Sequence, residues 1–498
     1  MTRLAGSETG RWASLIWGGF AAGCGVGFAM SLAANWVIPA ACVTVAAALI
    51  CAAVVPARAL GFALVSVAIV VGLLRGASAV ITPGPGTVDG HLGVRAVVIE
   101  GTVRSADPGS GTTAIIDASH LSDADTDARV SGGVLVSGPL IPALAPGDKV
   151  EIDASGLRPL YRRPGADSAE TLEREDVEAI ATSPQVFVTA AGGPSPARWI
   201  AWVQGRLLSA VNQALPEPGA ALTLGIAFGI HEPLSDDVRT SLQDAGLIHI
   251  VVVSGLKIVL VLGLVSAVAR VFEWSRRRTL LVALPLVAAY VLISGAGPAS
   301  IRSALMASAA MFAAAGARRT DPVPMLALVA ALMLGISPNL VEDPGFQLSF
   351  LGTAGILLLA APIAARLPGP RLIAEPFAVT VAAQVATFPV MAGTFGVISV
   401  AGPVANAVVL PLLPVMIVTG AAGALLSTVN PALGWVLLQV TGLGTSFVTT
   451  VARVLTALPG AAIQVGNWPA SWSIAEAAGV VAALATLAVM TRRTVLVR

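Results

Sequence analysis

The chain has 498 residues, of which 56% are hydrophobic and 11% are charged. Soluble proteins carry about a quarter charged residues, so this composition excludes an ordinary soluble domain and indicates an integral membrane protein. The formal net charge of +1 excludes a global basic field for nucleic acid, and any such partner has to be bound locally.

Three apolar segments open the chain, near residues 12–34, 36–55 and 59–76. Arg3 and Arg11 before the first segment imitate a signal peptide, but the apolar run is longer than a typical signal sequence and two more follow at once. We therefore expect a retained first helix and N-terminal membrane helices over residues 1–82. The three cysteines lie in the first two segments without metal-ligand spacing, so neither a metal site nor a cofactor is expected.

Residues 83–194 form a polar region with β-branched runs separated by Gly, Asp and Pro, a pattern that predicts strands. The runs lie at 94–107, 112–119, 128–138, 147–157 and 185–190. Such short strands favour a small OB-like barrel, and a generic β-sandwich remains the alternative. Residues 162–180 interrupt the pattern and predict a short helix. Because acidic residues outnumber basic ones here, a balance that repels phosphate, the domain is expected to dock a partner or act as a scaffold, or to bind a phosphate-bearing partner only through a local face.

Residues 195–245 are expected to form interfacial amphipathic helices, because Trp and Arg in 197–215 suit a membrane interface. Residues 246–498 form the larger membrane block. Its expected spans lie near 246–272, 279–297, 299–316, 322–337, 346–365, 373–395, 400–428, 433–457 and 473–491. The predicted fold is a polytopic α-helical membrane protein with about twelve segments, some of them re-entrant, and a small extracytoplasmic β domain that is OB-fold-like.

The positions of the arginines predict the orientation in the membrane. With the N-terminus inside, the inner segments contain Arg58, Arg270, Arg276, Arg277, Arg278, Arg318, Arg319, Arg366, Arg371, Arg492 and Arg493. The outer connections after the central block contain Glu342 and Asp343 but almost no basic residue, and Arg75 is the exception. The positive-inside rule therefore places both termini in the cytoplasm and the β domain outside a cytoplasmic (inner) membrane.

The segment 246–264 is an ordinary membrane helix except for a few polar groups in its middle. Only two lysines occur in the chain, and one of them, Lys257, is here. A cation at mid-bilayer costs about 2.5–3.5 kcal/mol on insertion scales, so Lys257 should face protein or water. Gly255 permits a helix break, and broken membrane helices are tolerated where they line a cavity. We therefore predict that Lys257 lines a polar cavity, whereas Ser254 alone is an ordinary membrane-helix residue.

Polar residues recur in the later segments. Arg302 follows a Gly-Ala-Gly-Pro interruption, and it either snorkels to the outer interface or faces the same cavity as Lys257. Asp343 precedes a helix and either caps its N-terminus or belongs to the site. Gln384 and Asn406 place amide dipoles at membrane depth, which suits a water-lined path.

These blocks, in this order, resemble the competence domain of the ComEC-type family of DNA-uptake membrane proteins. The matching features are His249, Ser254-Gly255-Leu256, Arg302-Ser303, "DPGFQLSF" at 343–350, Gln384, Pro389, Asn406 and Pro411. The resemblance covers roughly residues 90–460 and implies a channel for single-stranded DNA with an OB-like outer domain. The residues expected to line the DNA path are Arg239, His249, Ser254, Gly255, Lys257, Arg302, Asp343, Gln347, Gln384 and Asn406, with Arg239 at the outer mouth.

Two departures from the family pattern matter. Lys257 stands where the family usually has a second His, which keeps a donor but fixes a positive charge. Many members also carry a metallo-β-lactamase-like domain, and no His-x-His-x-Asp-His run is present here. We therefore expect no enzyme activity from this polypeptide.

An inside-negative potential opposes inward movement of phosphate by about 2.3 kcal/mol per charge per 100 mV. No Gly-x-x-x-x-Gly-Lys-Ser/Thr motor motif is present. The expected partners are single-stranded DNA, membrane lipids, a cytosolic ATPase, helicase or strand-binding protein, an outer DNA receptor and a separate nuclease.

Two other functions are considered. A secondary transporter or flippase for another anionic substrate would use the same broken helices and buried cations. A membrane hydrolase would pair Ser254 with His249, but their five-residue spacing puts them on nearly opposite sides of a regular helix.

Overall fold

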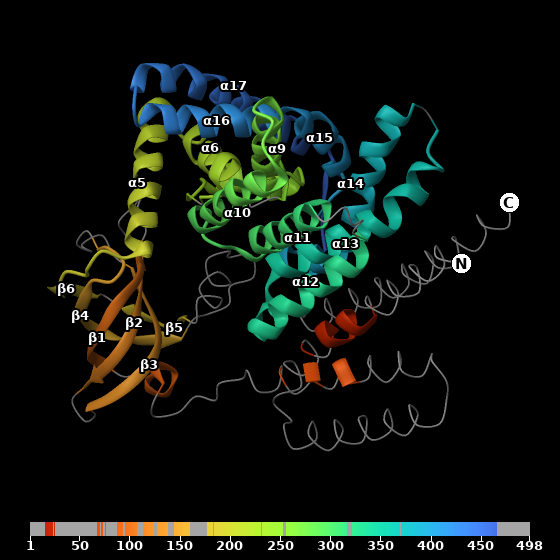
Figure 1. The fold of residues 1–498 in the computed structure, drawn as a ribbon. Helices are drawn as coiled ribbons and strands as arrows, with labels where there is room; N and C mark the ends of the chain where they lie inside the picture. Colours follow the sequence, from red (N-terminus) through yellow and green to blue (C-terminus); the bar gives the residue numbers. More distant parts are fainter. Residues whose placement is uncertain are drawn as a thin grey trace, which may run out of the picture.

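The computed structural model describes most of residues 87–465. Its gaps in that range are 93–94, 107–112, 124–126, 138–143, 160–176, 183, 231, 252–254, 316–320 and 369, and before it only residues 15–22, 24, 67–69, 71–72 and 75 are described. The helices predicted before residue 83 therefore lie largely, and the one at 473–491 entirely, outside the described residues. Figure 1 shows a β domain joined by one helix, α5, to a larger group of helices.

The β domain contains six strands, β1 (Arg95–Ala106), β2 (Thr113–Ser122), β3 (Asp127–Ser137), β4 (Lys149–Pro159), β5 (Val177–Thr182) and β6 (Gln185–Ala190). They are ordered β1-β2-β3-β5-β4-β6, and β1 also pairs with β4. The strands β1, β2, β3, β5 and β4 therefore close into a ring, in which only the β3–β5 pairing is parallel.

The core of this ring is made by the β-branched runs of the sequence. Ile99, Ile116, Val134 and Ile152, from four different strands, are fully buried. Successive side chains of a strand point to opposite faces, so the alternating apolar residues of each run meet inside the ring. The five predicted strands are confirmed as β1, β2, β3, β4 and β6.

The sixth strand corrects the last part of the helix predicted over 162–180, and residues 162–176 of that prediction lie outside the described residues. Residues Val177–Thr182 form β5, which pairs with both β3 and β4. β5 and β6 continue one antiparallel register on β4, with Thr182 opposite Gly156 and Gln185 opposite Asp153. Cross-strand pairing on two sides outweighs any local preference for helix at residues 177–180.

The helical part contains thirteen α-helices among the described residues. They are α5 (Pro196–Ala214), α6 (Gly219–Phe228), α7 (Asp236–Asp244), α8 (Ile248–Val251), α9 (Gly255–Val271), α10 (Arg276–Ile293), α11 (Pro298–Ala315), α12 (Pro322–Ile336), α13 (Pro344–Ala364), α14 (Arg371–Val390), α15 (Gly402–Val409), α16 (Leu413–Ser427) and α17 (Pro431–Thr456). The helices α16 and α17 lie side by side, as do α13 and α14 (Figure 1).

Five segments within the described residues are long and apolar enough to cross a membrane. They are Ile248–Val271, Pro344–Ala364, Ala374–Phe395, Gly402–Ser427 and Pro431–Thr456. The protein is therefore a membrane protein with a β domain. Several spans contain interruptions, because α14 passes into the π-helical segment η4 (Met391–Phe395) and α15 is joined to α16 by the 3-10 segment η5 (Leu410–Leu412).

Two further short elements pair across the sequence. The strand β7 (Val397–Ser399) pairs antiparallel with β8 (Ala462–Gln464) after α17. The 3-10 segment η3 (Pro338–Glu342) leads from α12 into α13.

The region 195–245 fits the interfacial prediction only in part. α5 is amphipathic, with Leu207 and Val211 buried and Trp199 and Trp202 exposed. In contrast, α6 is apolar on every side, and all of its residues after Gly219 are buried. α6 is therefore an internal helix and not an interfacial one, because its sequence offers no polar face to a membrane surface.

Candidate functional site

Arg302 on α11 holds a polar cluster between helices. Its Nε donates a hydrogen bond to Ser349 Oγ of α13 at 2.6 Å, and its Nη2 donates to Ser303 Oγ at 3.2 Å. Its Nη1 is 3.6 Å from Met306 Sδ, and its Cζ is 5.8 Å from the ring centroid of Phe350. Among the described residues no carboxylate pairs with this guanidinium, so none of them neutralises its charge.

The start of α9 packs against this cluster at Gly255. A Cβ at Gly255 would lie 2.7 Å from Ser303 Oγ and 3.7 Å from Arg302 Nη2. Only glycine allows this close approach without displacing the hydroxyl. Gly255, Arg302, Ser303, Ser349 and Phe350 are called the Arg302 cluster below. Ser254, which precedes it in the chain, lies outside the described residues.

A second polar group surrounds Gln384 on α14. Gln384 Nε2 donates a hydrogen bond to the carbonyl oxygen of Ser399 in β7. A Cβ at Gly246 would lie 3.0 Å from Ser399 Oγ and 3.1 Å from Gly402 Cα, and Gly246 has a φ of +69°. Asn406 lies one turn after Gly402 on α15 and is buried. Gly246, Gln384, Ser399, Gly402 and Asn406 are called the Gln384 cluster below.

Two oxygen atoms of the Gln384 cluster, a hydroxyl and an amide oxygen, lack a hydrogen-bond partner among the described residues. Ser399 Oγ and Asn406 Oδ1 are buried and have no hydrogen-bond partner among the described residues. Such atoms are costly in a closed interior, and they are usually satisfied by water or a bound group.

The short helix α8 connects the two clusters. It lies between Gly246 of the Gln384 cluster and Gly255 of the Arg302 cluster. His249, which α8 carries, is exposed, whereas Ile250 and Val251 beside it are buried. The structure thus brings Gly255 and Arg302 together, and places Gln384 and Asn406 in a second group at the other end of the same segment.

The described residues enclose Lys257, whereas the sequence predicts that it lines a polar cavity, and its part in a DNA path stays a prediction. Its side chain is 1% exposed, and its Nζ donates a hydrogen bond to the carbonyl oxygen of Gly225 in α6 at 2.5 Å. Lys257 is two residues after Gly255 on one helix, so its side chain points away from the helix face on which Gly255 contacts Ser303. Lys257 therefore faces α6, while Arg302 faces α13, and the two cations do not share a space.

A cavity is present elsewhere among the described residues. It has a volume of about 340 Å³ and lies between the end of α7 and the end of α17. Its lining is formed by Asp244, residues 456–462 and Gln464. It contains none of the predicted path residues.

Asp343 and Gln347 hold the turn that leads into α13. Asp343 Oδ1 accepts a hydrogen bond from Phe346 N at 2.5 Å, so Asp343 is the N-cap of α13. Gln347 Nε2 donates to the carbonyl oxygen of Val341 at 2.7 Å. The capping interpretation of Asp343 therefore accounts for its burial, and the role of both residues in a path stays a prediction.

Arg239 lies on α7, which packs against α17 and β7. An exposed ion pair of 3.4 Å joins Asp237 of α7 to Arg453 of α17. The side chain of Arg239 is partly buried. Its place at the outer mouth of a path stays a prediction.

The comparisons with known proteins bear on the segment that contains both clusters. The family described as competence protein matches residues 226–492, which is more than half of the chain. The chain belongs to the competence protein family. It is also 25% identical over 230 residues to "ComE operon protein 3" of Bacillus subtilis (strain 168), a match that covers 46% of this chain. The matched part is 29% of that relative's length, and no solved structure matches the chain.

The competence protein match coincides with the helical part. It begins within α6 and includes every residue of the Arg302 and Gln384 clusters. The β domain and α5 precede it. The resemblance found in the sequence is therefore confirmed for the region in which the candidate site lies.

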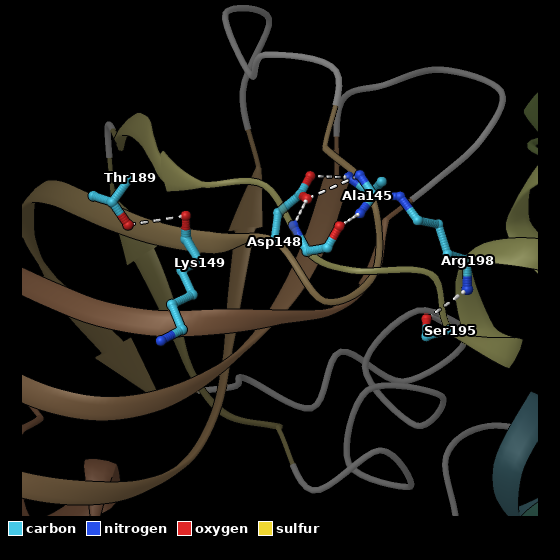
Figure 2. A network of polar contacts seen from close by, with 7 residues as sticks. Ala145, Asp148, Lys149, Thr189, Ser195 and Arg198 are labelled. Carbon is cyan, nitrogen blue, oxygen red and sulfur yellow. Dashed lines mark hydrogen bonds and ion pairs between the residues drawn. The ribbon is translucent and has the colours of Figure 1, made fainter.

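A polar network outside the competence match joins the β domain to α5 (Figure 2). Asp148 Oδ1 accepts hydrogen bonds from Gly192 N at 2.7 Å and from Arg198 Nη2 at 3.0 Å, and its Oδ2 accepts from Ala145 N at 2.9 Å. Arg198 also donates to the carbonyl oxygen of Gly192, and its own N–H donates to Ser195 Oγ.

The charge of Asp148 is stabilised by these donors. Burial alone would raise the pKa of Asp148, but the N–H groups of Gly192 and Ala145 and the Arg198 guanidinium lower it below its ordinary value. The network thus fixes the linker between β6 and α5.

Asp148, Gly225 and the internal helix α6 are not among the features that the sequence predicts. Asp148 lies in a Gly-Asp-Lys turn that indicates only a loop, and Arg198 is distant in sequence. Gly225 contributes a backbone carbonyl, which no side-chain pattern can indicate. The apolar run of α6 is visible in the sequence, but at 10 residues it is too short to be identified as a span.

Proposed function

We propose that this protein is a channel that carries single-stranded DNA across the cytoplasmic membrane during natural transformation. The proposal rests on the environment of Arg302 in a chain of the competence protein family. Arg302 is partly buried beside the interrupted helix α8–α9, and no carboxylate pairs with it in the described part of the chain. A guanidinium has five N–H donors, so donors remain for a phosphate oxygen beyond its bonds to Ser349 and Ser303.

The small number of charges suits passage better than tight binding. Phosphate cannot cross hydrocarbon, and conduction needs sites that bind favourably but weakly. Because Lys257 is turned toward α6, Arg302 is the charged group that we assign to the DNA. The exposed side chain of His249 and the polar atoms of the Gln384 cluster would extend the same path.

The β domain is proposed to be an OB-like fold outside the membrane. The closed ring of β1, β2, β3, β5 and β4 supports this topology. Its acidic balance favours docking of a partner, such as an outer DNA receptor, over a basic DNA-gripping surface.

The proposed location is the inner membrane, with about twelve membrane segments, some of them re-entrant, and with both termini in the cytoplasm. The distribution of arginines supports this orientation. We also propose that a cytosolic ATPase, helicase or strand-binding protein pulls the strand and that a separate nuclease prepares it. The lack of motor and nuclease motifs in these 498 residues supports both partners.

The alternative function is a secondary transporter or flippase for another anionic substrate. The interrupted segments α8–α9 and α15–α16 favour it, because broken helices with buried cations also serve transporters. The two functions predict different effects of changing Arg302. A DNA channel would lose DNA uptake, whereas a transporter or flippase would lose movement of its other anionic substrate.

The test compares charge-matched variants in a naturally transformable host that carries this gene in place of its own. Arg302→Met should lower transformation by added DNA about tenfold or more, the effect of one lost charged hydrogen bond, while growth on ordinary nutrients and membrane abundance stay normal. Arg366→Met is the matched control, because Arg366 is exposed, follows the end of α13 and donates to the nearby carbonyl oxygen of Pro362. Normal transformation with Arg302→Met, or a growth defect without a transformation defect, would overturn the proposal.

A further inference from the structure

The C-terminal end of α6 lies deep inside the protein. The helix has 10 residues, so it is about 15 Å long, half of the hydrocarbon thickness. Gly229 ends it in the left-handed conformation, and its N–H donates to Gly225 O and Leu224 O. The last carbonyls of a helix carry the negative end of the helix dipole, and a carbonyl oxygen has two lone pairs, so Gly225 O can accept a second donor beside Gly229 N–H.

Two side chains from neighbouring helices bind this helix end. Lys257 Nζ of α9 donates to Gly225 O at 2.5 Å, and the Tyr290 hydroxyl of α10 donates to Ala227 O at 3.3 Å. Lysine and tyrosine each occur only twice in the chain, and one copy of each is used here. A cation next to a helix C-terminus is stabilised by the dipole, which explains how Lys257 is tolerated in a dry interior.

The burial of Lys257 excludes an interfacial explanation. The side chain is 1% exposed, so it does not extend to the protein surface. Among the described residues, the carbonyl oxygen of Gly225 in α6 is the hydrogen-bond partner of its ammonium group.

Gly225 of α6 also packs against α8, the short helix before the interruption that precedes α9. A Cβ at Gly225 would lie 2.5 Å from Val251 Cγ1 and 3.2 Å from the carbonyl oxygen of Val251, the last residue of α8. Gly225 therefore contacts α8 through close packing and α9 through the hydrogen bond from Lys257. Residues 252–254 connect these two helices.

We propose that Lys257 and Tyr290 are positioning residues, which anchor α9 and α10 on the C-terminal end of α6 and thereby fix the interrupted helix between the two polar clusters. The charge of Lys257 is directed at the helix end and not at a translocated strand. The inference deepens the proposed function, and only its DNA-uptake readout rests on that function.

A thiol reporter on α8 tests the anchor. In the full chain, with Cys24, Cys42 and Cys51 replaced by serine, Val251→Cys places a thiol on the buried contact with Gly225. A membrane-impermeant maleimide should label it slowly. Lys257→Met should raise the labelling rate about tenfold or more, the change in local opening expected when a hydrogen bond to a charged group is lost.

Two milder variants keep the test informative if Lys257→Met does not reach the membrane. Lys257→Gln retains a donor and should raise labelling less, and Tyr290→Phe removes one hydroxyl and should also raise it less. The matched control is Val329→Cys, buried on α12 in a different hydrophobic cluster, whose labelling should stay constant in every variant.

The outcomes separate the positioning role from the DNA role. Unchanged labelling of Cys at position 251 together with lost DNA uptake would show that Lys257 acts on the strand, and the inference would be wrong. Equal increases at positions 251 and 329 would show general loosening and would also overturn it. Increased labelling at position 251 alone supports the inference. If DNA uptake also stays normal in every variant, including Arg302→Met, the proposed function is wrong but the positioning role of Lys257 and Tyr290 is still supported.

Discussion

Removing the Asp148 carboxylate should release the linker between the β domain and α5. In Asp148→Ala, the N–H groups of Gly192 and Ala145 and the Arg198 guanidinium lose their acceptor. All three donors bond an ionised carboxylate, and at about 1.5 kcal/mol each they give a loss of about 4–5 kcal/mol, because the Asp148 side chain is only 6% exposed. About 1.4 kcal/mol corresponds to a factor of ten, so amide exchange at residues 191–195 should accelerate by about three orders of magnitude.

The assay is hydrogen exchange followed by mass spectrometry on the full chain in detergent. Peptides that contain Gly192 should exchange faster in Asp148→Ala, and peptides of α17 should not change. Asp153→Ala is the matched control, because Asp153 is exposed on β4. Unchanged exchange at Gly192, or an equal acceleration in the control, would refute the reasoning.

The same network has a defined pH dependence. The pKa of Asp148 is lower in the folded protein than its ordinary value of 3.8, so the carboxylate contributes its full stabilisation above that value. The contribution is lost as the pH falls from 3.8 through the lowered pKa of the folded state. In an acid titration, the difference in linker protection between the wild type and Asp148→Asn should therefore be constant at neutral pH and shrink only below about pH 4.

Three further predictions follow from close contacts. Ile152→Ala in the fully buried core of the β domain should lower the free energy of unfolding of that domain by about 2–5 kcal/mol, measured by urea denaturation, and an unchanged midpoint would contradict the assigned core. Gly355→Val should separate α13 from α14 and lower thermal stability, because a Cβ at Gly355 would already lie 2.5 Å from Ala386 Cβ. The control is Gly263→Val, where there is open space, and equal thermal stability of the two variants would contradict the packing. Gly255→Ala should displace Ser303 and lower transformation with normal membrane abundance, and full activity would show that the approach of α9 to Arg302 is not needed.

The sequence predicts best where a local pattern coincides with the final packing. The strands β1 to β4 were expected from alternating β-branched residues, and the α9 interruption from Gly255. β5 was missed because its strand character depends on pairing with β3 and β4, which are distant in the chain. Register and partner choice are tertiary properties, and no local composition determines them.

The candidate site shows the same limit at the level of single residues. A charge in an apolar segment correctly indicates that Lys257 and Arg302 must be shielded from lipid. The charge does not indicate which group provides the shielding. Lys257 donates to a backbone carbonyl of α6, whereas Arg302 donates to hydroxyls of α11 and α13. The direction of each side chain depends on which helix packs on which face, and therefore on the whole fold.

The most direct test of the account is whether DNA in transit contacts the Arg302 cluster. A photoreactive amino acid is placed at Ser349, and single-stranded DNA is trapped during uptake by a bulky block at its trailing end. We predict a DNA crosslink at position 349 that disappears in Arg302→Met, and none from the same amino acid at Val329, which is buried on α12. A crosslink of equal yield at both positions, or none at position 349 while DNA uptake proceeds, would contradict the account.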